Sequence, residues 1–91
     1  MANDNANVIT IQLSKGFFAK IDKEDQDLCQ YIWHTAYLGK LPYAHRNVTV
    51  RMPGMMHTVI MTRILGRTLS KDEVVDHKNG DSLDNTRLNL R

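Results

Sequence analysis

Apolar and polar residues partly alternate in residues 8–13 (Val-Ile-Thr-Ile-Gln-Leu), a segment rich in β-branched side chains. The Ser-Lys-Gly sequence at 14–16 supplies a turn, and residues 17–21 (Phe-Phe-Ala-Lys-Ile) form a second apolar run. Two such runs joined by a short turn that contains glycine predict a β-hairpin.

A short helix is predicted over residues 23–32, where Leu28, Tyr31 and Ile32 recur at helical spacing. Asp22 or a neighbouring residue can cap its N-terminus. Three acidic residues (Glu24, Asp25 and Asp27) lie near the positive end of the helix dipole, which favours them there.

Aromatic and β-branched residues are enriched again in residues 33–38 and 43–51. The Gly-Lys-Leu-Pro sequence at 39–42 between them is typical of a connecting turn. This arrangement predicts a second β-hairpin.

A second helix is predicted over residues 56–65, after the helix-breaking pair Pro53-Gly54, and Gly66 ends it. Arg63 lies on its polar side and Arg67 just beyond its end. Its apolar side carries Met56, Val59, Ile60 and Ile64, with Met61 as a further candidate.

A short strand at Val74-Val75, a tight turn at Asn79-Gly80 and a polar stretch over 82–91 complete the pattern. Together these elements predict an α+β fold of small antiparallel β-hairpins with two short helices. We expect a single domain over residues 8–91 after a flexible polar N-terminus at 1–7. Residues 8–73 hold the hairpins and helices, and residues 74–91 hold the motif described below.

The length and composition limit the classes of protein to which this chain can belong. A length of 91 residues, with 42% hydrophobic and 24% charged residues, is typical of one small globular domain rather than a disordered chain. The single cysteine, Cys29, excludes an intramolecular disulfide and a cysteine-based zinc site, and it fits a reducing compartment. No signal peptide or apolar run of membrane-spanning length is recognisable. We therefore expect a cytoplasmic protein without a membrane partner.

The charges are distributed unevenly along the chain. No Asp or Glu occurs between Asp27 and Asp72, whereas this stretch contains six Lys and Arg residues. Clustered cations release counterions from phosphates on binding, so a polyanionic partner is one explanation. A solvated basic face without a ligand explains the same pattern equally well.

Asp76 and His77 are the strongest candidates for chemistry. A carboxylate is a hard oxygen ligand suited to Mg²⁺ or Mn²⁺, and a neutral imidazole beside it can take a proton from an attacking water. An Asn side chain further on could hold the imidazole in the required tautomer. On spacing alone, turn chemistry with a surface histidine is the commoner explanation of such a pair.

The whole run of residues 75–91, Val-Asp-His-Lys-Asn-Gly-Asp-Ser-Leu-Asp-Asn-Thr-Arg-Leu-Asn-Leu-Arg, closely resembles the signature of phage-type HNH homing endonucleases. In that family the pattern is D-H-x-N-G-D-x-x-D-N followed by N-L-R. Weaker similarity continues in the same order through the N-terminal region, at residues 11–16, 19–25, Trp33, Tyr43-Ala44 and Met56-His57.

The resemblance implies a ββα-metal finger that breaks DNA with the help of Mg²⁺ or Mn²⁺. His77 would be the general base, Asp76 the first metal ligand and Asn89 the residue that orients the histidine. A structural loop would consist of Asn79, Gly80, Asp84 and Asn85. Arg87 and Arg91 would contact phosphate or stabilise the leaving group, although each is equally well explained as a solvent-facing arginine.

The family pattern continues past N-L-R into a helix that supplies another metal ligand, whereas the sequence given stops at Arg91. The finger is therefore incomplete as written, with one protein ligand where two are expected. Three explanations stay open. The chain is a truncated form, it has lost catalysis and kept DNA binding, or a partner chain in a homodimer completes the site.

The leading hypothesis is thus an HNH-type endonuclease module that binds double-stranded DNA, and the alternative is an inactive, dimeric DNA-binding protein of the same descent. A small interaction module with a methionine-rich surface is a third. The aromatic residues and methionines are expected mostly in the core, and His34, His45 and His57 in structural or surface positions. Further DNA contacts are expected from Arg46, Arg51, Arg63 and Arg67, on a ribbon or a helix that enters the major groove.

Overall fold

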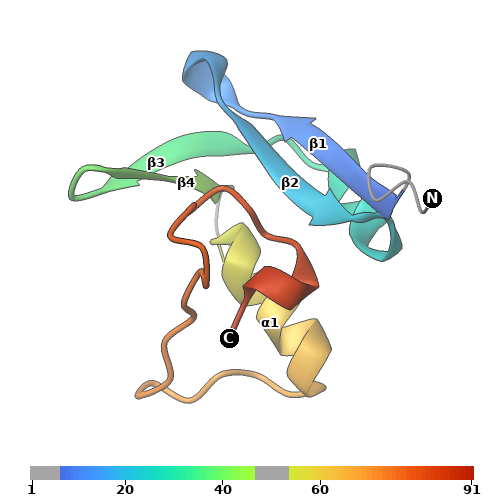
Figure 1. Cartoon of the computed structure of the whole chain (residues 1–91), viewed down its shortest axis with the longest axis vertical. Coiled ribbons are helices and arrows are strands. Elements are labelled where there is room, and N and C mark those ends of the chain that lie inside the picture. The colour runs from blue at the N-terminus through green and yellow to red at the C-terminus, as the bar shows by residue number, and fades with distance from the viewer. Residues whose placement is uncertain (1–6, 47–53) are drawn as a thin grey trace.

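Two antiparallel β-hairpins, one α-helix and three short 3₁₀ helices lie in the part of the chain that the computed structural model describes, residues 7–46 and 54–91 (Figure 1). The predicted α+β class is confirmed. The elements in chain order are β1 (Val8–Gln12), η2 (Ser14–Gly16), β2 (Phe18–Asp22), η3 (Lys23–Gln30), β3 (His34–Leu38), β4 (Leu41–His45), α1 (Met56–Leu65) and η4 (Arg87–Asn89).

The β1–β2 hairpin forms as predicted, with Val8 opposite Asp22 and Gln12 opposite Phe18. Alternate residues of β2, Ala19 and Ile21, are fully buried, so this face of the strand packs in the core. The connecting turn contains Gly16 at φ +81°, a left-handed conformation that glycine adopts without strain.

The helix predicted over 23–32 is a 3₁₀ helix, η3, and ends at Gln30. Leu28 is buried, and its carbonyl accepts a hydrogen bond from Trp33 Nε1 at 2.8 Å. Ile32 is 79% exposed, so its predicted place on the apolar side is wrong. Asp22 makes no cap either, because its carboxylate accepts a hydrogen bond from the backbone N–H of Arg87 at 2.7 Å.

The second hairpin pairs β3 with β4, and its turn contains two residues, Gly39 and Lys40, rather than four. Gly39 has φ +64°, as the first central residue of a tight hairpin turn requires. Thr35 joins the two hairpins, because its N–H donates to Ser14 Oγ at 2.9 Å and its hydroxyl donates to the Ser14 carbonyl. Residues 47–51 of the predicted strand lie outside the described residues.

Helix α1 covers the residues predicted for it, and Gly66 follows at φ +70° with its N–H bonded to the Thr62 carbonyl. Met56, Val59, Ile60 and Met61 are buried. Ile64 was expected on the same side but is 40% exposed, because this end of the helix extends past the core (Figure 1). No helix of the described part of the chain is long and apolar enough to cross a membrane.

The aromatic residues are less buried than predicted. Trp33 lies in the core, whereas Phe18, Tyr31 and Tyr37 are 53%, 36% and 47% exposed. The core is instead filled by aliphatic and methionine side chains from both hairpins, η3 and α1. The methionine prediction holds for Met56 and Met61, and Met52 lies outside the described part.

The C-terminal segment contains no strand at Val74-Val75, and Val74 is 85% exposed. Pairing begins one residue later, between residues 76–78 and 89–91, with His77 opposite Leu90. The intervening loop lies along β2, since the Lys20 N–H donates to the Leu83 carbonyl and the Asn85 N–H donates to the Lys20 carbonyl, both at 2.8 Å.

A buried carboxylate joins this C-terminal segment to the rest of the fold. Asp25 in η3 has no exposed surface. It accepts hydrogen bonds from Arg63 Nη1 of α1 at 3.1 Å, and from Arg87 Nε and Nη2 of η4 at 3.0 and 2.9 Å. One carboxylate thus connects three elements that are far apart in sequence.

Replacing Asp25 should therefore destabilise the whole domain. We expect Asp25→Ala to lower the free energy of unfolding by about 3 kcal/mol, because two arginines lose the partner that compensates their charge. Asp27→Ala is the matched control, since Asp27 also pairs with Arg63 but its side chain is 50% exposed. That change should cost less than about 1 kcal/mol. Urea denaturation measures both, and equal losses would contradict the role assigned to Asp25.

Candidate functional site

The imidazole of His77 is held in one orientation at the base of the C-terminal loop. The residue is only 8% exposed, and its Nε2 lies 2.8 Å from Oδ1 of Asn85. A carbonyl oxygen can only accept, so Nε2 carries the hydrogen of this bond and Nδ1 keeps the free lone pair. This is the state in which an imidazole can accept a proton.

Asn85 is positioned by the first hairpin rather than by the loop alone. Its side chain is fully buried, and its backbone N–H is bonded to the Lys20 carbonyl of β2. Its Nδ2 is buried and has no hydrogen-bond partner among the residues described. An unpaired buried donor costs roughly 1–3 kcal/mol, which offsets part of the stability gained from the bond between Asn85 and His77.

The expected contact between Asn89 and His77 is not formed. Asn89 Oδ1 accepts from the N–H of Asn79 at 3.1 Å, and its Nδ2 donates to Asn79 Oδ1 at 3.0 Å and to the Asp84 carbonyl at 2.8 Å. The reason is the register. His77 faces Leu90, so Asn89 points to the opposite side of the two-stranded segment and braces the loop there.

The loop between the paired segments is fixed by its own side chains. Asp84 Oδ1 accepts from the N–H and hydroxyl of Thr86, and Asp84 Oδ2 accepts from Asn79 Nδ2 at 3.0 Å. Asn79 Oδ1 accepts from the Asp81 N–H, and Gly80 takes φ +78° in the tight turn. The Ser82 hydroxyl donates to the Pro42 carbonyl, so the loop also contacts β4.

Two further rings enclose His77. The ring centroids of His57 and His77 lie 5.3 Å apart at 84°, and Tyr43 lies 5.5 Å from His57 and 6.0 Å from His77. Burial, with a smaller contribution from His77, lowers the pKa of His57 to about 4. His57 is therefore neutral at neutral pH and places no second cation beside His77.

A cavity of about 110 Å³ opens next to these rings. This volume holds several waters or one phosphate group. The residues that line it are Leu41, Tyr43, Val75, Asp76, His77, Gly80 and Ser82. Neither Tyr43 nor the Asn85–His77 bond was predicted from the sequence. The only feature of the sequence that pointed to the Asn85–His77 bond was the adjacent Asp84-Asn85 pair of the motif.

Asp76 is the carboxylate in the lining of this cavity, and its Oδ2 lies 2.9 Å from Nε of Arg91. The side chains of both residues are at least 60% exposed, so the pair is weak and easily exchanged. Within residues 7–46 and 54–91, no three His, Cys, Asp or Glu side chains are grouped closely enough to hold a metal ion. Asp76 is thus a lone carboxylate with an arginine partner, whereas Mg²⁺ is ordinarily held by one or two carboxylates together with substrate phosphates.

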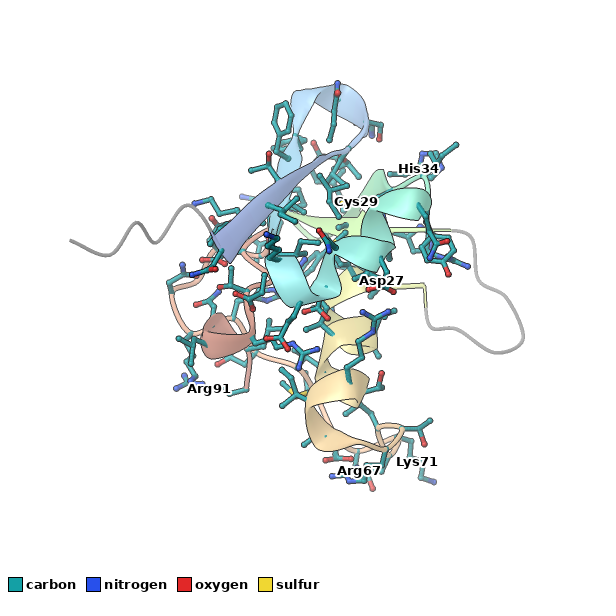
Figure 2. All side chains as sticks on the ribbon, turned by 90° about the vertical axis from the view of Figure 1, so that its right-hand side faces the viewer. Asp27, Cys29, His34, Arg67, Lys71 and Arg91 are labelled. Atoms are coloured by element: carbon teal, nitrogen blue, oxygen red, sulfur yellow. The ribbon has the colours of Figure 1, made fainter. Side chains whose placement is uncertain are left out.

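Most arginines expected to contact DNA are engaged within the molecule. Arg63 pairs with Asp25 and Asp27, and Arg87 pairs with Asp25 and Glu24. Arg67 forms two hydrogen bonds with Glu73, which lower the pKa of that carboxyl to about 2. Arg67 and Arg91 lie at separate places on the surface (Figure 2).

Arg46 differs from the other described arginines because no acidic residue of the described ranges forms an ion pair with it. Its guanidinium carbon lies 4.0 Å above the ring of Tyr31 at the end of β4. Arg51 lies outside the described residues. His34 is exposed and His45 is half-buried, both on the same hairpin as Arg46.

No protein-family model, curated protein or solved structure matches this chain.

The lowered pKa of His57 predicts a loss of stability in acid. Between about pH 6.5 and pH 4 the unfolded chain binds a proton that the folded protein excludes, so the folded state weakens as the pH falls. We expect His57→Phe to remove about 2 kcal/mol of this acid-induced loss of unfolding free energy. This is less than the difference between the unfolded and folded pKa of His57 implies, because the ring is only half-buried. His34→Phe, on an exposed histidine, is the control. Urea denaturation at pH 7 and about pH 4.5 measures the free energy of unfolding. An equal loss of this free energy between the two pH values in wild type and His57→Phe would contradict the prediction.

Proposed function

We propose that this chain is an HNH-type endonuclease module that binds double-stranded DNA and hydrolyses a phosphodiester bond with a divalent metal. The observation that carries the proposal is the buried His77, whose Nε2 is bonded to Asn85 Oδ1 at 2.8 Å, in the wall of a cavity that Asp76 also lines. The motif gives the order of these residues in the sequence, and the contact adds that the His77 ring is held by the Asn85 side chain.

In the proposed reaction, a water in the cavity attacks the phosphorus atom while the bond from phosphorus to the leaving sugar oxygen breaks. Nδ1 of His77 accepts the proton of the attacking water, and solvent protonates the leaving oxygen. Asn85 keeps the hydrogen on Nε2 before the transfer and accepts it more strongly afterwards, when the ring is positively charged. The neutral rings of Tyr43 and His57 border this charge without repelling it. Catalysis thus depends on a histidine that is positioned before the substrate binds.

Asp76 would hold the metal, together with water and the phosphate oxygens of the substrate. When bound, a divalent ion polarises the phosphoryl oxygen and stabilises the charge of the transition state. Asp76 would have to exchange Arg91 for the metal, and an exposed pair of this kind is worth only about 0–1 kcal/mol. Arg91 would then be released beside the reacting phosphate.

A second candidate function is DNA binding without catalysis, in a protein that acts as a dimer. The ion pair between Arg91 and Asp76 favours it, since the carboxylate proposed for the metal already has a cationic partner. In this alternative the loop of residues 79–89 serves structure, which its internal hydrogen bonds explain equally well. Metal-dependent nicking separates the two candidates.

Nicking of supercoiled plasmid in Mg²⁺ or Mn²⁺, with an EDTA control, tests the first candidate. We expect His77→Ala to lower the rate by about 10²–10⁴-fold, because the general base is lost, with little change in DNA affinity. His45→Ala is the matched control, since His45 is half-buried on β4 and lies outside the cavity lining. Equal loss of binding and cleavage in His77→Ala would sink the assignment. DNA retardation without nicking by the wild type would establish the second candidate.

The arginine contacts predict different salt dependences. Arg46→Ala should weaken DNA binding and lower the slope of log K against log salt by about one, as the loss of one phosphate contact does. Arg67→Ala should leave the slope nearly unchanged, because that guanidinium is held by Glu73. Titrations at several salt concentrations measure both slopes. A lower slope for Arg67→Ala and an unchanged slope for Arg46→Ala would indicate that DNA binds at the end of α1 and not at the β3–β4 hairpin.

A further inference from the structure

The tip of the β3–β4 hairpin exposes large apolar side chains to solvent. Leu38 is 54% exposed, and Leu41 and Tyr37 are each 47% exposed. Leu38 and Leu41 are cross-strand partners, so they project from the same face of the ribbon beside the two-residue turn. The hairpin extends sideways beyond the remainder of the fold (Figure 1).

The base of this tip is supported on its other face. Phe17 packs edge-on against Tyr37 with ring centroids 6.3 Å apart, and the Lys15 ammonium lies 4.9 Å from the centre of the Tyr37 ring. Tyr37 is thereby linked to the β1–β2 turn. These contacts hold the strand next to Leu38 and Leu41 against the β1–β2 turn.

The charges around the tip select the partner. Lys40 lies in the turn between the leucines, and Arg46 follows at the end of β4 on the same hairpin. A second copy of this chain would bring a further Lys40 against the leucine pair, which repels self-association there. A polyanion with an apolar interior between its charged strands fits both features, and stacked base pairs between phosphates have this composition.

The same strand leads from the tip into the cavity of the candidate site. Leu41 and Tyr43 both line that cavity together with Asp76 and His77. From Lys40 to Tyr43 an extended strand covers about 10 Å, which is about three base steps of 3.4 Å along one DNA strand. A base step held at the tip would thus lie a few nucleotides from a phosphate held in the cavity.

We propose that the tip is a DNA wedge, in which Leu38 and Leu41 insert between base pairs and kink the duplex, while Lys40 contacts the backbone. This rests on the proposed DNA binding but not on catalysis. The free-energy cost of unstacking one base step is offset by the burial of two leucine side chains and by the extra contacts that a bent duplex makes with the protein. Flexible pyrimidine–purine steps open most easily, so such steps are the preferred sites.

Ring closure by DNA ligase tests the wedge without knowledge of a target sequence. A linear duplex of about 120 base pairs is shorter than the persistence length and closes poorly, so a protein that kinks DNA raises the yield of circles. The wild type should raise it by about tenfold or more. The double variant Leu38→Ser/Leu41→Ser should not, and it should bind about tenfold more weakly with an unchanged salt slope, because leucine releases no counterions.

Leu88→Ser is the matched control, since Leu88 is 89% exposed on η4, and it should form circles as the wild type does. The conservative variant Leu38→Met/Leu41→Met should retain closure, because methionine keeps an apolar side chain at both positions, and the unchanged salt slope of the serine variant excludes misfolding as the cause of its loss. Circles made equally well by the serine variant, or DNA retardation by the wild type without circles, would overturn the wedge and leave DNA binding intact. Absence of any retardation would overturn both. Dimers that sedimentation detects in the wild type and not in the serine variant would assign the tip to self-association instead.

Discussion

The structure depends on the compensation of one buried charge. Asp25 is completely removed from solvent, and a carboxylate in that position is tolerated only when cations and hydrogen bonds replace its water. Arg63 and Arg87 provide them from positions 38 and 62 residues later in the chain. Helix η3 can therefore be buried only when α1 and the C-terminal segment are both in place, which makes the small domain cooperative.

The same network determines the chemistry of the candidate site. Arg87 is anchored through its guanidinium to Asp25 and through its backbone N–H to Asp22, so the loop before it is drawn against β2. There the Lys20 carbonyl fixes the Asn85 backbone, and the Asn85 side chain fixes His77. The orientation of the histidine is thus set by tertiary structure, and damage to the core would disturb the imidazole without touching the cavity.

Local elements could be predicted from the sequence because their causes are local. The β1–β2 hairpin and α1 with Gly66 follow from periodicity and turn residues within a few positions. The partner of His77 could not, because a shift of one residue in strand pairing moves a side chain to the other face. Pairing begins at Asp76 instead of Val74, and with Leu90 opposite His77 this sends Asn89 away from the imidazole and leaves Asn85 beside it.

The stretch without acids was expected either to bind a polyanion or to form a solvated basic face, but acids from both ends of the chain fold back onto it. Arg63 and Arg67 are neutralised in this way, whereas no described ion pair holds Lys40 or Arg46 at the β3–β4 hairpin. A protein that contacts only a few phosphates gains little from counterion release, since affinity from this source grows with each phosphate neutralised. Binding to DNA would then require contacts of another kind, and the apolar tip, which carries Leu38 and Leu41 on the same ribbon as Arg46, is where the fold offers them.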